Sequence, residues 1–119
     1  MENPEFESYT RPNGHDEFME FYHALPKKER ARLDSVITKT STYGLLIAAK
    51  QEWIKKLDVN LFELRSKSGS NIQRALYFHV EGNRFVITHG FTKKTQKTPA
   101  AQIDRAKRIR AEFEKEENQ

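Results

Sequence analysis

Seven basic residues lie between positions 65 and 97 of the chain, where the sequence has a single acid. Arginine presents a planar fork to phosphate oxygens, whereas lysine is a compact point charge on a flexible stem. Together they suit a phosphodiester, because its negative charge rises in a five-coordinate transition state. The residue types therefore favour binding or cleavage of nucleic acid. The seven residues are Arg65, Lys67, Arg74, Arg84, Lys93, Lys94 and Lys97.

The densest part of this set is the stretch HGFTKKTQKTP, residues 89–99, which also holds three threonines. Such a loop is either a solvent-exposed connection without a binding role or the rim of a phosphate site. We expect Thr98 to cap a final helix that starts at Pro99, because threonine is a good N-cap and proline fits the first helical position. Thr92 and Thr95 remain candidate hydrogen-bond donors to a phosphate.

The net charge of +4 conceals an uneven distribution. Residues 1–25 carry a net charge of −5 and residues 112–119 a net charge of −3, which leaves +12 on residues 26–111. A segment this basic attracts polyanions, and nucleic acid is the commonest polyanion in the cytosol. From charge alone, a lysine-rich surface that only maintains solubility is an equally good interpretation.

Composition argues against several other kinds of site. The chain has no cysteine, and its four histidines lack the spacing of metal ligands, so we expect no metal and no other cofactor. It has no serine–histidine–aspartate pattern, no glycine-rich phosphate loop and no HExxH motif. No stretch approaches the roughly 18 apolar residues of a membrane span, and the start, MENPEFESY, is acidic. We therefore expect a cytoplasmic protein with no membrane partner.

The elements that position the basic residues follow one another along the chain. Hydrophobic alternation and turn signals at 67–71 and 81–83 predict an antiparallel meander. Its three expected strands are Leu61–Ser66, Ile72–Val80 and Arg84–Phe91. Apolar residues at helical spacing predict further elements around it. These are a short strand at Glu5–Thr10, helices at His15–Leu25, from Pro26 to an interruption at Gly44 and at Leu45–Lys50, and a last helix from Pro99 to about Glu114.

This order predicts an α+β fold, with a small antiparallel sheet, an N-terminal helical hairpin and a C-terminal helix. We expect a single domain over residues 1–119. No element is assigned to the region of Trp53 and Leu57, which serve as apolar anchors. The acidic end, residues 112–119, opposes the helix dipole and should fray.

Two of the arginines need separate consideration. An isolated Arg65 would most often pair with Glu63 or a helix acid, but with Arg74 and the lysines close by we favour phosphate binding. Arg74 shares its strand face with Leu76 and Phe78. Either this strand is buried on both faces, or a bulge re-aims the arginine.

His79 is the weaker of two strand histidines with a candidate catalytic role, and His89 is the stronger. It shares the alternation of Phe85, Ile87 and Phe91, so a hydrogen-bonded core histidine is the commoner interpretation. A role as acid or base is the alternative.

Residues 60–106, NLFELRSKSGSNIQRALYFHVEGNRFVITHGFTKKTQKTPAAQIDRA, resemble the RelE/ParE superfamily of bacterial toxins, in particular its HigB-like, phage-derived branch. Three motifs carry the resemblance, in the family's order and spacing. They are an L-[FW]-E-L-R strand, an R-x-x-Y-F strand, and an HGF-x-KKTxKTP loop that leads into the terminal helix.

The resemblance implies a toxin of a type II toxin–antitoxin system, usually a metal-independent endoribonuclease that cuts mRNA in the ribosomal A site. The RNA's own 2′-hydroxyl attacks, two arginines hold the scissile phosphate, and a lysine stabilises charge and protonates the leaving oxygen. The catalytic residues so implied are Arg65, Arg74, Lys93 and Lys94. Lys56 resembles a further RNA-contacting lysine, and we expect additional RNA contacts from Lys67, Arg84 and Lys97.

Two departures from the family leave the general base open. The position of Glu63 is basic in some RelE-type enzymes, and no tyrosine follows the KKT loop where some members use one. Candidates for the base are His89, a loop lysine and a group of the ribosome.

The main alternative is a non-catalytic module that binds RNA or its antitoxin. A gyrase poison of the ParE type is disfavoured, because that branch commonly lacks these arginines and lysines. If the protein is a toxin, the expected partner is its cognate antitoxin. We expect a small helix-turn-helix protein with an acidic segment that covers the basic surface.

Overall fold

The computed structural model describes residues 3–118, and they form the α+β fold predicted from the sequence. Within these residues there are four helices and one five-stranded sheet. The strands are β1 (Glu5–Ser8), β2 (Ile54–Asp58), β3 (Leu61–Ser68), β4 (Asn71–Glu81) and β5 (Arg84–Lys93). The helices are α1 (Glu17–Ala24), α2 (Lys27–Tyr43), α3 (Leu45–Lys50) and α4 (Ala100–Glu117).

The sheet has the order β1-β5-β4-β3-β2, with β2 to β5 antiparallel and β1 parallel to β5. The three predicted strands are confirmed as β3, β4 and β5, each slightly longer than expected. The prediction missed β2, whose sequence IKKLD has lysines at its second and third positions. Charged side chains are common on an edge strand, because they discourage pairing with other chains. They also remove the apolar alternation by which a strand is recognised.

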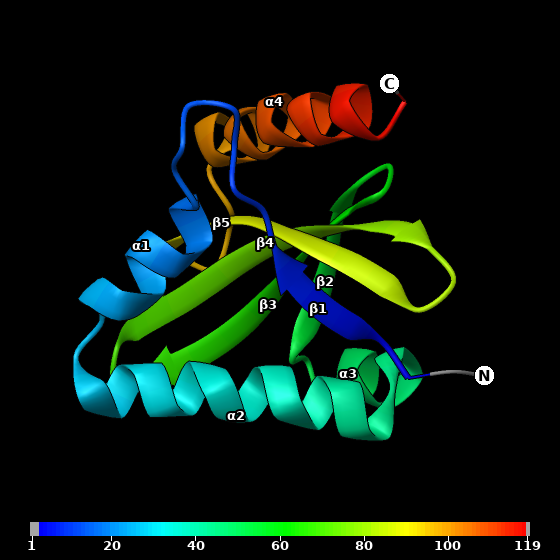
Figure 1. Cartoon of the computed structure of the whole chain (residues 1–119). Helices are drawn as coiled ribbons and strands as arrows, with labels where there is room; N and C mark the ends of the chain where they lie inside the picture. Colours follow the sequence, from blue (N-terminus) through cyan, green and yellow to red (C-terminus); the bar gives the residue numbers. More distant parts are fainter. Residues whose placement is uncertain (1–2, 119) are drawn as a thin grey trace.

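Helices cover both faces of the sheet (Figure 1). α1, α2 and α3 pack on one face, here called the α2 face, and α4 packs on the other, the α4 face. The central strand β4 is consequently buried on both faces. This resolves the position of Arg74, which lies on the α4 face with Leu76 and Phe78 and needs no bulge of its own.

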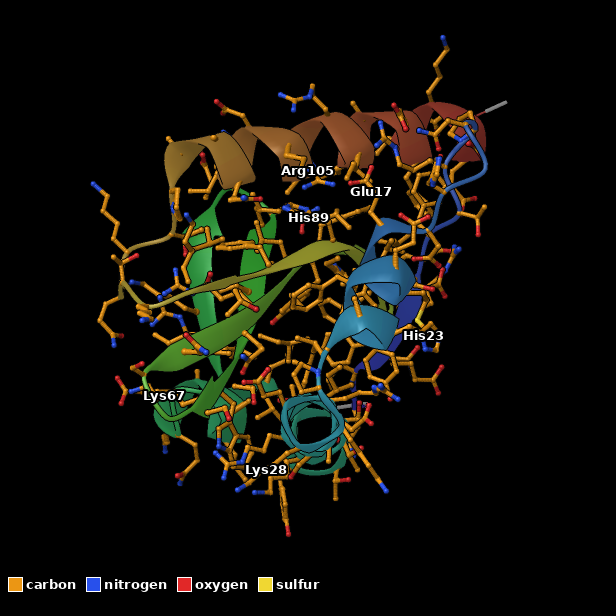
Figure 2. All side chains as sticks on the ribbon, turned by 90° about the vertical axis from the view of Figure 1, so that its left-hand side faces the viewer. Glu17, His23, Lys28, Lys67, His89 and Arg105 are labelled. Atoms are coloured by element: carbon orange, nitrogen blue, oxygen red, sulfur yellow. The ribbon has the colours of Figure 1, made fainter. Side chains whose placement is uncertain are left out.

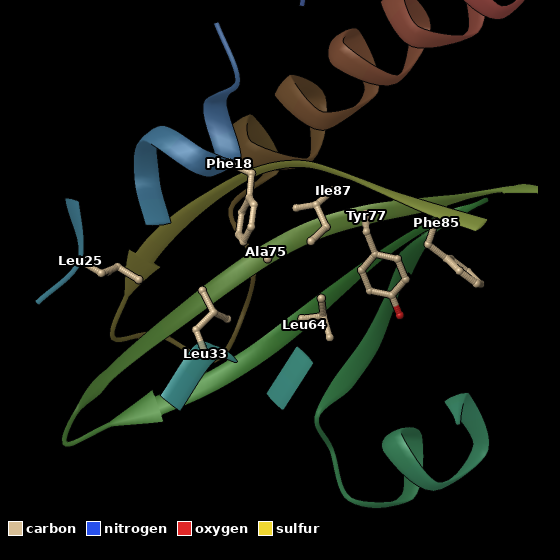
Figure 3. Packing of buried hydrophobic residues seen from close by; sticks show 8 residues of the cluster. All are labelled: Phe18, Leu25, Leu33, Leu64, Ala75, Tyr77, Phe85 and Ile87. Atoms are coloured by element: carbon tan, nitrogen blue, oxygen red, sulfur yellow. The ribbon is translucent and has the colours of Figure 1, made fainter. Parts of the chain in front are cut away.

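The larger core lies on the α2 face (Figure 3). Leu33 of α2 is completely buried there against strand residues such as Leu64 and Tyr77. Gly90 of β5 faces the same layer, and a Cβ at this position would overlap the ring of Phe21 from α1. The glycine of the HGF motif is therefore explained by close helix–strand packing.

A bulge in β5 reverses the side-chain alternation that the sequence suggests. Leu76 pairs with His89 and Tyr77 pairs with Ile87, so Thr88 has no partner on β4. A one-residue shift moves all later side chains to the opposite face. Ile87 therefore joins the α2 face, whereas His89 points to α4, and the predicted common face of the two residues is wrong.

The predicted cap of the last helix is also wrong. The helix begins at Ala100, with Pro99 as its N-cap and no capping side chain. Thr98 is buried and its hydroxyl is used elsewhere. The helix continues to Glu117, beyond the expected end, and whether residues 112–119 fray in solution stays a prediction. The interruption at Gly44 is confirmed, with φ of 89° between α2 and α3.

Candidate functional site

Residues that pair directly on neighbouring strands share a face of the sheet, so the registers define rows of side chains across β3, β4 and β5. On the α4 face, Arg65, Arg74 and Phe91 form one row. Lys67, Ile72 and Lys93 form the next row towards the β3–β4 turn. The structure thus brings four of the predicted basic residues to one region of the α4 face: Arg65, Arg74, Lys67 and Lys93.

A buried carboxylate lies at the centre of this region. Glu63 is inaccessible to solvent, and it accepts hydrogen bonds from Arg65 Nε and from Thr98 Oγ1, the latter at 2.6 Å. The Thr98 hydroxyl in turn accepts a bond from Arg74 Nη1 at 3.3 Å. Four side chains from β3, β4 and the 94–99 loop therefore form one network. Arg65 therefore forms the salt bridge to Glu63 that the sequence analysis named as the alternative to phosphate binding.

Arg74 is completely buried, with its guanidinium carbon 5.7 Å from the centroid of the Phe91 ring. Burial lowers the pKa of Arg74 below the usual arginine value; the Glu63 carboxylate opposes this shift and Arg65 adds to it. Its Nε and Nη2 atoms have no hydrogen-bond partner among the described residues. Buried donors are rarely left unpaired, so the three N–H groups on these two atoms lack an acceptor, which a phosphate oxygen could supply once the site opens.

Arg65 is the more accessible of the two arginines, although only 12% of its side chain is exposed. Its Nη1 donates to Gln96 Oε1 at 3.3 Å, and its Nη2 donates to the Gln96 carbonyl. The 94–99 loop therefore crosses the sheet from β5 to β3 and occupies the outward fork of Arg65. Apart from Thr98 and Pro99, every residue of this loop is exposed.

The other predicted residues divide into two groups. Like Lys93, Lys94 and Lys97 are exposed, and they follow β5 in the loop that carries Thr98. Arg84 lies at the opposite end of β5, where it pairs with Glu7 at 2.8 Å and Glu117 at 2.9 Å.

Lys56 is also separated from the arginines. It pairs with Phe62 and therefore lies on the α2 face of the edge strand. Its neighbour Lys55 pairs with Glu63 on the α4 face, which makes Lys55 a candidate that the sequence analysis missed. The alternation of side chains along β2 would have placed Lys55 and Lys56 on opposite faces of the sheet. It could not be applied because β2 was not recognised as a strand in the sequence.

His89 is buried beneath α4 (Figure 2). Its Nε2 lies 2.9 Å from Gln102 Oε1 and its Nδ1 lies 3.0 Å from Thr88 Oγ1. Nε2–H can donate to Gln102 Oε1, whereas the Thr88 hydroxyl that faces Nδ1 has a single proton and donates to the Leu76 carbonyl at 3.2 Å. Burial lowers the pKa of His89, against the effect of the Gln102 hydrogen bond. The geometry is that of a hydrogen-bonded core histidine.

A groove of about 500 Å³ adjoins Arg65 at the edge of β3. One wall is α2, the end wall is the turn between α3 and β2, and residues of β3 and the 94–99 loop complete it. We call it the α2 groove. Its lining carries a single acid, Glu52, and four basic residues: Arg32, Lys39, Arg65 and Lys67.

The fold and the basic site can be compared with known proteins. A family described as phage-derived protein Gp49-like (DUF891) matches residues 20–111, which is more than half of the chain. The chain belongs to this Gp49-like family. The family is a toxin-like family of toxin–antitoxin systems, so the Gp49-like protein has an antitoxin as its expected partner. No curated protein matches the sequence.

The Gp49-like region covers the whole candidate site. It begins within α1 and ends within α4, so it includes the arginine row, the 94–99 loop and the α2 groove. β1 and the last turns of α4 lie outside it. In the Gp49-like chain, no helix within residues 3–118 is long and apolar enough to cross a membrane.

Proposed function

We propose that this Gp49-like protein is a toxin of the RelE/HigB type that cleaves mRNA in the ribosomal A site. The single observation that carries the proposal is the direct pairing of Arg65 with Arg74 on one sheet face. Like charges placed opposite each other destabilise a strand pair by some tenths of a kcal/mol. An anion between them offsets that cost, and a phosphodiester supplies one with the geometry that guanidinium groups prefer.

The proposed reaction uses Arg65 and the lysines at the end of β5. The 2′-hydroxyl of the RNA loses its proton and attacks the adjacent phosphorus, and the bond to the 5′-oxygen of the next nucleotide breaks. Arg65 binds the phosphate oxygens as their charge rises, and Lys93 or Lys94 donates a proton to the leaving oxygen. The products are a 2′,3′-cyclic phosphate and a 5′-hydroxyl.

The general base is proposed to come from the ribosome or from a loop lysine. His89 was the third candidate, but both of its ring nitrogens lie within hydrogen-bond distance of side chains beneath α4. For His89 to take a proton from RNA, Gln102 would have to move aside.

Access to the arginines requires a change in the 94–99 loop. In the free protein, Gln96 occupies the outward fork of Arg65 and Thr98 contacts Arg74. We propose that the phosphate replaces Gln96 on Arg65, and that displacement of Thr98 exposes the unpaired N–H groups on Nε and Nη2 of Arg74. These N–H groups would then have the acceptor that they lack within the described residues.

The partner that controls such an activity is proposed to be a helix-turn-helix antitoxin with an acidic segment. Residues 26–111 carry a net charge of +12, and an acidic segment placed over the α4 face would neutralise the arginine and lysine rows. An mRNA target implies a cytoplasmic location.

Cell-free translation tests the proposal. The wild-type chain should stop protein synthesis and leave cleaved message, whereas Arg65→Ala should lose at least 100-fold in rate, about 2.7 kcal/mol of transition-state stabilisation. Lys115→Ala removes an exposed cation from the far end of α4 and serves as the control. Equal cleavage by the Arg65→Ala protein would refute the proposed role of the site.

One observation favours a second candidate, the non-catalytic module. Arg65 is already paired with Glu63, and Arg74 is inaccessible. A protein of this kind would bind RNA or antitoxin with a salt dependence that weakens when Lys67 and Lys93 are replaced. It would yield no RNA fragments under any condition.

A further inference from the structure

The α2 groove has an uncommon balance of charge for a surface hollow. No carboxylate within residues 3–118 forms a salt bridge with Arg32, Lys39 or Lys67. Arg32 and Lys39 are seven residues apart on α2, so they lie on the same helix face about 10 Å from each other. Together with Lys67 on β3, they place cations on two sides of the groove. Its electrostatic character is that of a site for a linear polyanion.

The end wall of the groove is formed by Trp53, the only tryptophan of the chain. Its backbone N–H donates to the Ala48 carbonyl at 2.9 Å, and its carbonyl accepts from the Arg65 N–H at 2.8 Å. The preceding residue, Glu52, has φ of 62°, which is uncommon for a residue other than glycine. This turn holds the indole beside the outer edge of β3, where it is only partly buried.

Side chains of α2 contact the Trp53 indole. Lys39 Nζ lies 5.6 Å from the centroid of the Trp53 ring, and the Tyr43 ring is 6.3 Å away at an angle of 46°. Lys39 is exposed and its side chain is flexible, so a planar group can displace it. A partly exposed aromatic ring among cations is the arrangement by which proteins bind single-stranded nucleic acid: bases stack on the ring and phosphates meet the cations.

We infer that the α2 groove binds one unpaired nucleotide of the RNA, next to the phosphate held by Arg65. The base stacks on Trp53, and the phosphate of that nucleotide contacts Arg32 and Lys67. Arg65 belongs to the arginine row and also lines the groove. The nucleotide in the groove is therefore the one directly next to the scissile phosphate. The inference rests on RNA being the substrate, as proposed above, and adds a subsite that positions it.

The single tryptophan makes the subsite directly observable. A short single-stranded RNA that is titrated into the full chain should quench the Trp53 emission, and the same sequence as a duplex should not. The affinity of fluorescein-labelled RNA, measured by anisotropy, should fall about 5- to 150-fold for Trp53→Ala, the range seen for loss of one stacked base. Trp53→Phe keeps an aromatic face and should retain most of the affinity.

Charge variants test the phosphate contacts separately. Arg32→Ala should weaken binding and reduce the slope of log affinity against log salt by about 0.7, the value for one phosphate contact to a single strand. Lys115→Ala should leave both unchanged. Arg32 and Lys115 are exposed, so these two variants should fold even if Trp53→Ala does not.

The outcomes distinguish this inference from the proposed function. Quenching with no message cleavage would support the subsite and refute the nuclease. Cleavage that persists in Trp53→Ala, with unchanged RNA affinity and no quenching of the wild type, would overturn the subsite and leave the nuclease intact. Equal quenching by duplex RNA would also overturn it, since a paired base cannot stack on Trp53.

Discussion

Arg65 on β3 and Arg74 on β4 are direct cross-strand partners, and one buried carboxylate, that of Glu63, lies beside both. Glu63 is bonded to Arg65 and reaches Arg74 through the Thr98 hydroxyl. The Glu63 carboxylate is thus the negative charge that stabilises both guanidinium groups. The site is consequently held together by a residue that need not touch the substrate.

Neutralising that charge should be costly. Glu63→Gln keeps the shape but leaves Arg65 and Arg74 without a counter-ion, so we expect the free energy of unfolding to fall by about 3 kcal/mol. Urea denaturation followed by circular dichroism measures this loss. The exposed Glu114→Gln is the control, and a loss below about 1 kcal/mol at position 63 would show that the carboxylate is not needed.

Gly90 should tolerate no side chain while Phe21 is present. Gly90→Ala forces its methyl group into the Phe21 ring, and we expect a loss of about 1–3 kcal/mol in stability. Combining it with Phe21→Leu should recover part of that loss, because the two positions are in contact. A double-mutant cycle in which the two effects are simply additive would contradict the packing described above.

The pH dependence of stability should report the burial of His89. Its pKa in the folded protein lies below the value of about 6.5 for an unfolded chain, so the unfolded state takes up the proton first. Stability should therefore be fully present above pH 6.5 and decrease as the pH falls, by up to about 1.4 kcal/mol per unit.

His89→Gln provides the comparison, since it removes the titrating ring. Thermal unfolding at pH 7.5 and pH 5.5 should show a smaller loss in this variant than in the wild type. The other histidines are the same in both proteins, so their effects cancel. Equal losses in the two proteins would mean that His89 titrates normally.

Arg84 should not contribute to the proposed toxin activity. It lies at the far end of β5 and is partly exposed in pairs with Glu7 and Glu117, so Arg84→Ala should cost less than about 1 kcal/mol in stability. Inhibition of translation should stay at the wild-type level. A loss similar to that of Arg65→Ala would show that RNA extends to this end of the sheet.

The sequence was sufficient for the elements with strong periodicity. The alternation in LFELRS predicted that Arg65 faces away from Phe62 and Leu64, and the structure confirms it. Gly44 predicted the break between two helices, because few residues other than glycine adopt its backbone angles.

What the sequence could not provide depends on contacts between distant residues. The bulge at Thr88 leaves no mark in the local pattern, yet it decides which face His89 occupies. The hydroxyl of Thr98 could either cap the N-terminus of α4 or bind a distant side chain. It donates to the buried carboxylate of Glu63, 35 residues earlier in the chain. β2 forms by pairing with the edge of β3, a contact that the local sequence does not show. The faces on which Lys55 and Lys56 lie could therefore be assigned only from that pairing.

We propose that this site cleaves mRNA on the ribosome through Arg65. The most direct measurement is the mapping of message ends in a reconstituted translation reaction with the purified chain, with and without ribosomes. We expect fragments that end in a 2′,3′-cyclic phosphate and begin with a 5′-hydroxyl, formed only with ribosomes and lost in Arg65→Ala. Intact message, or fragments with 3′-hydroxyl ends that persist in Arg65→Ala, would contradict it.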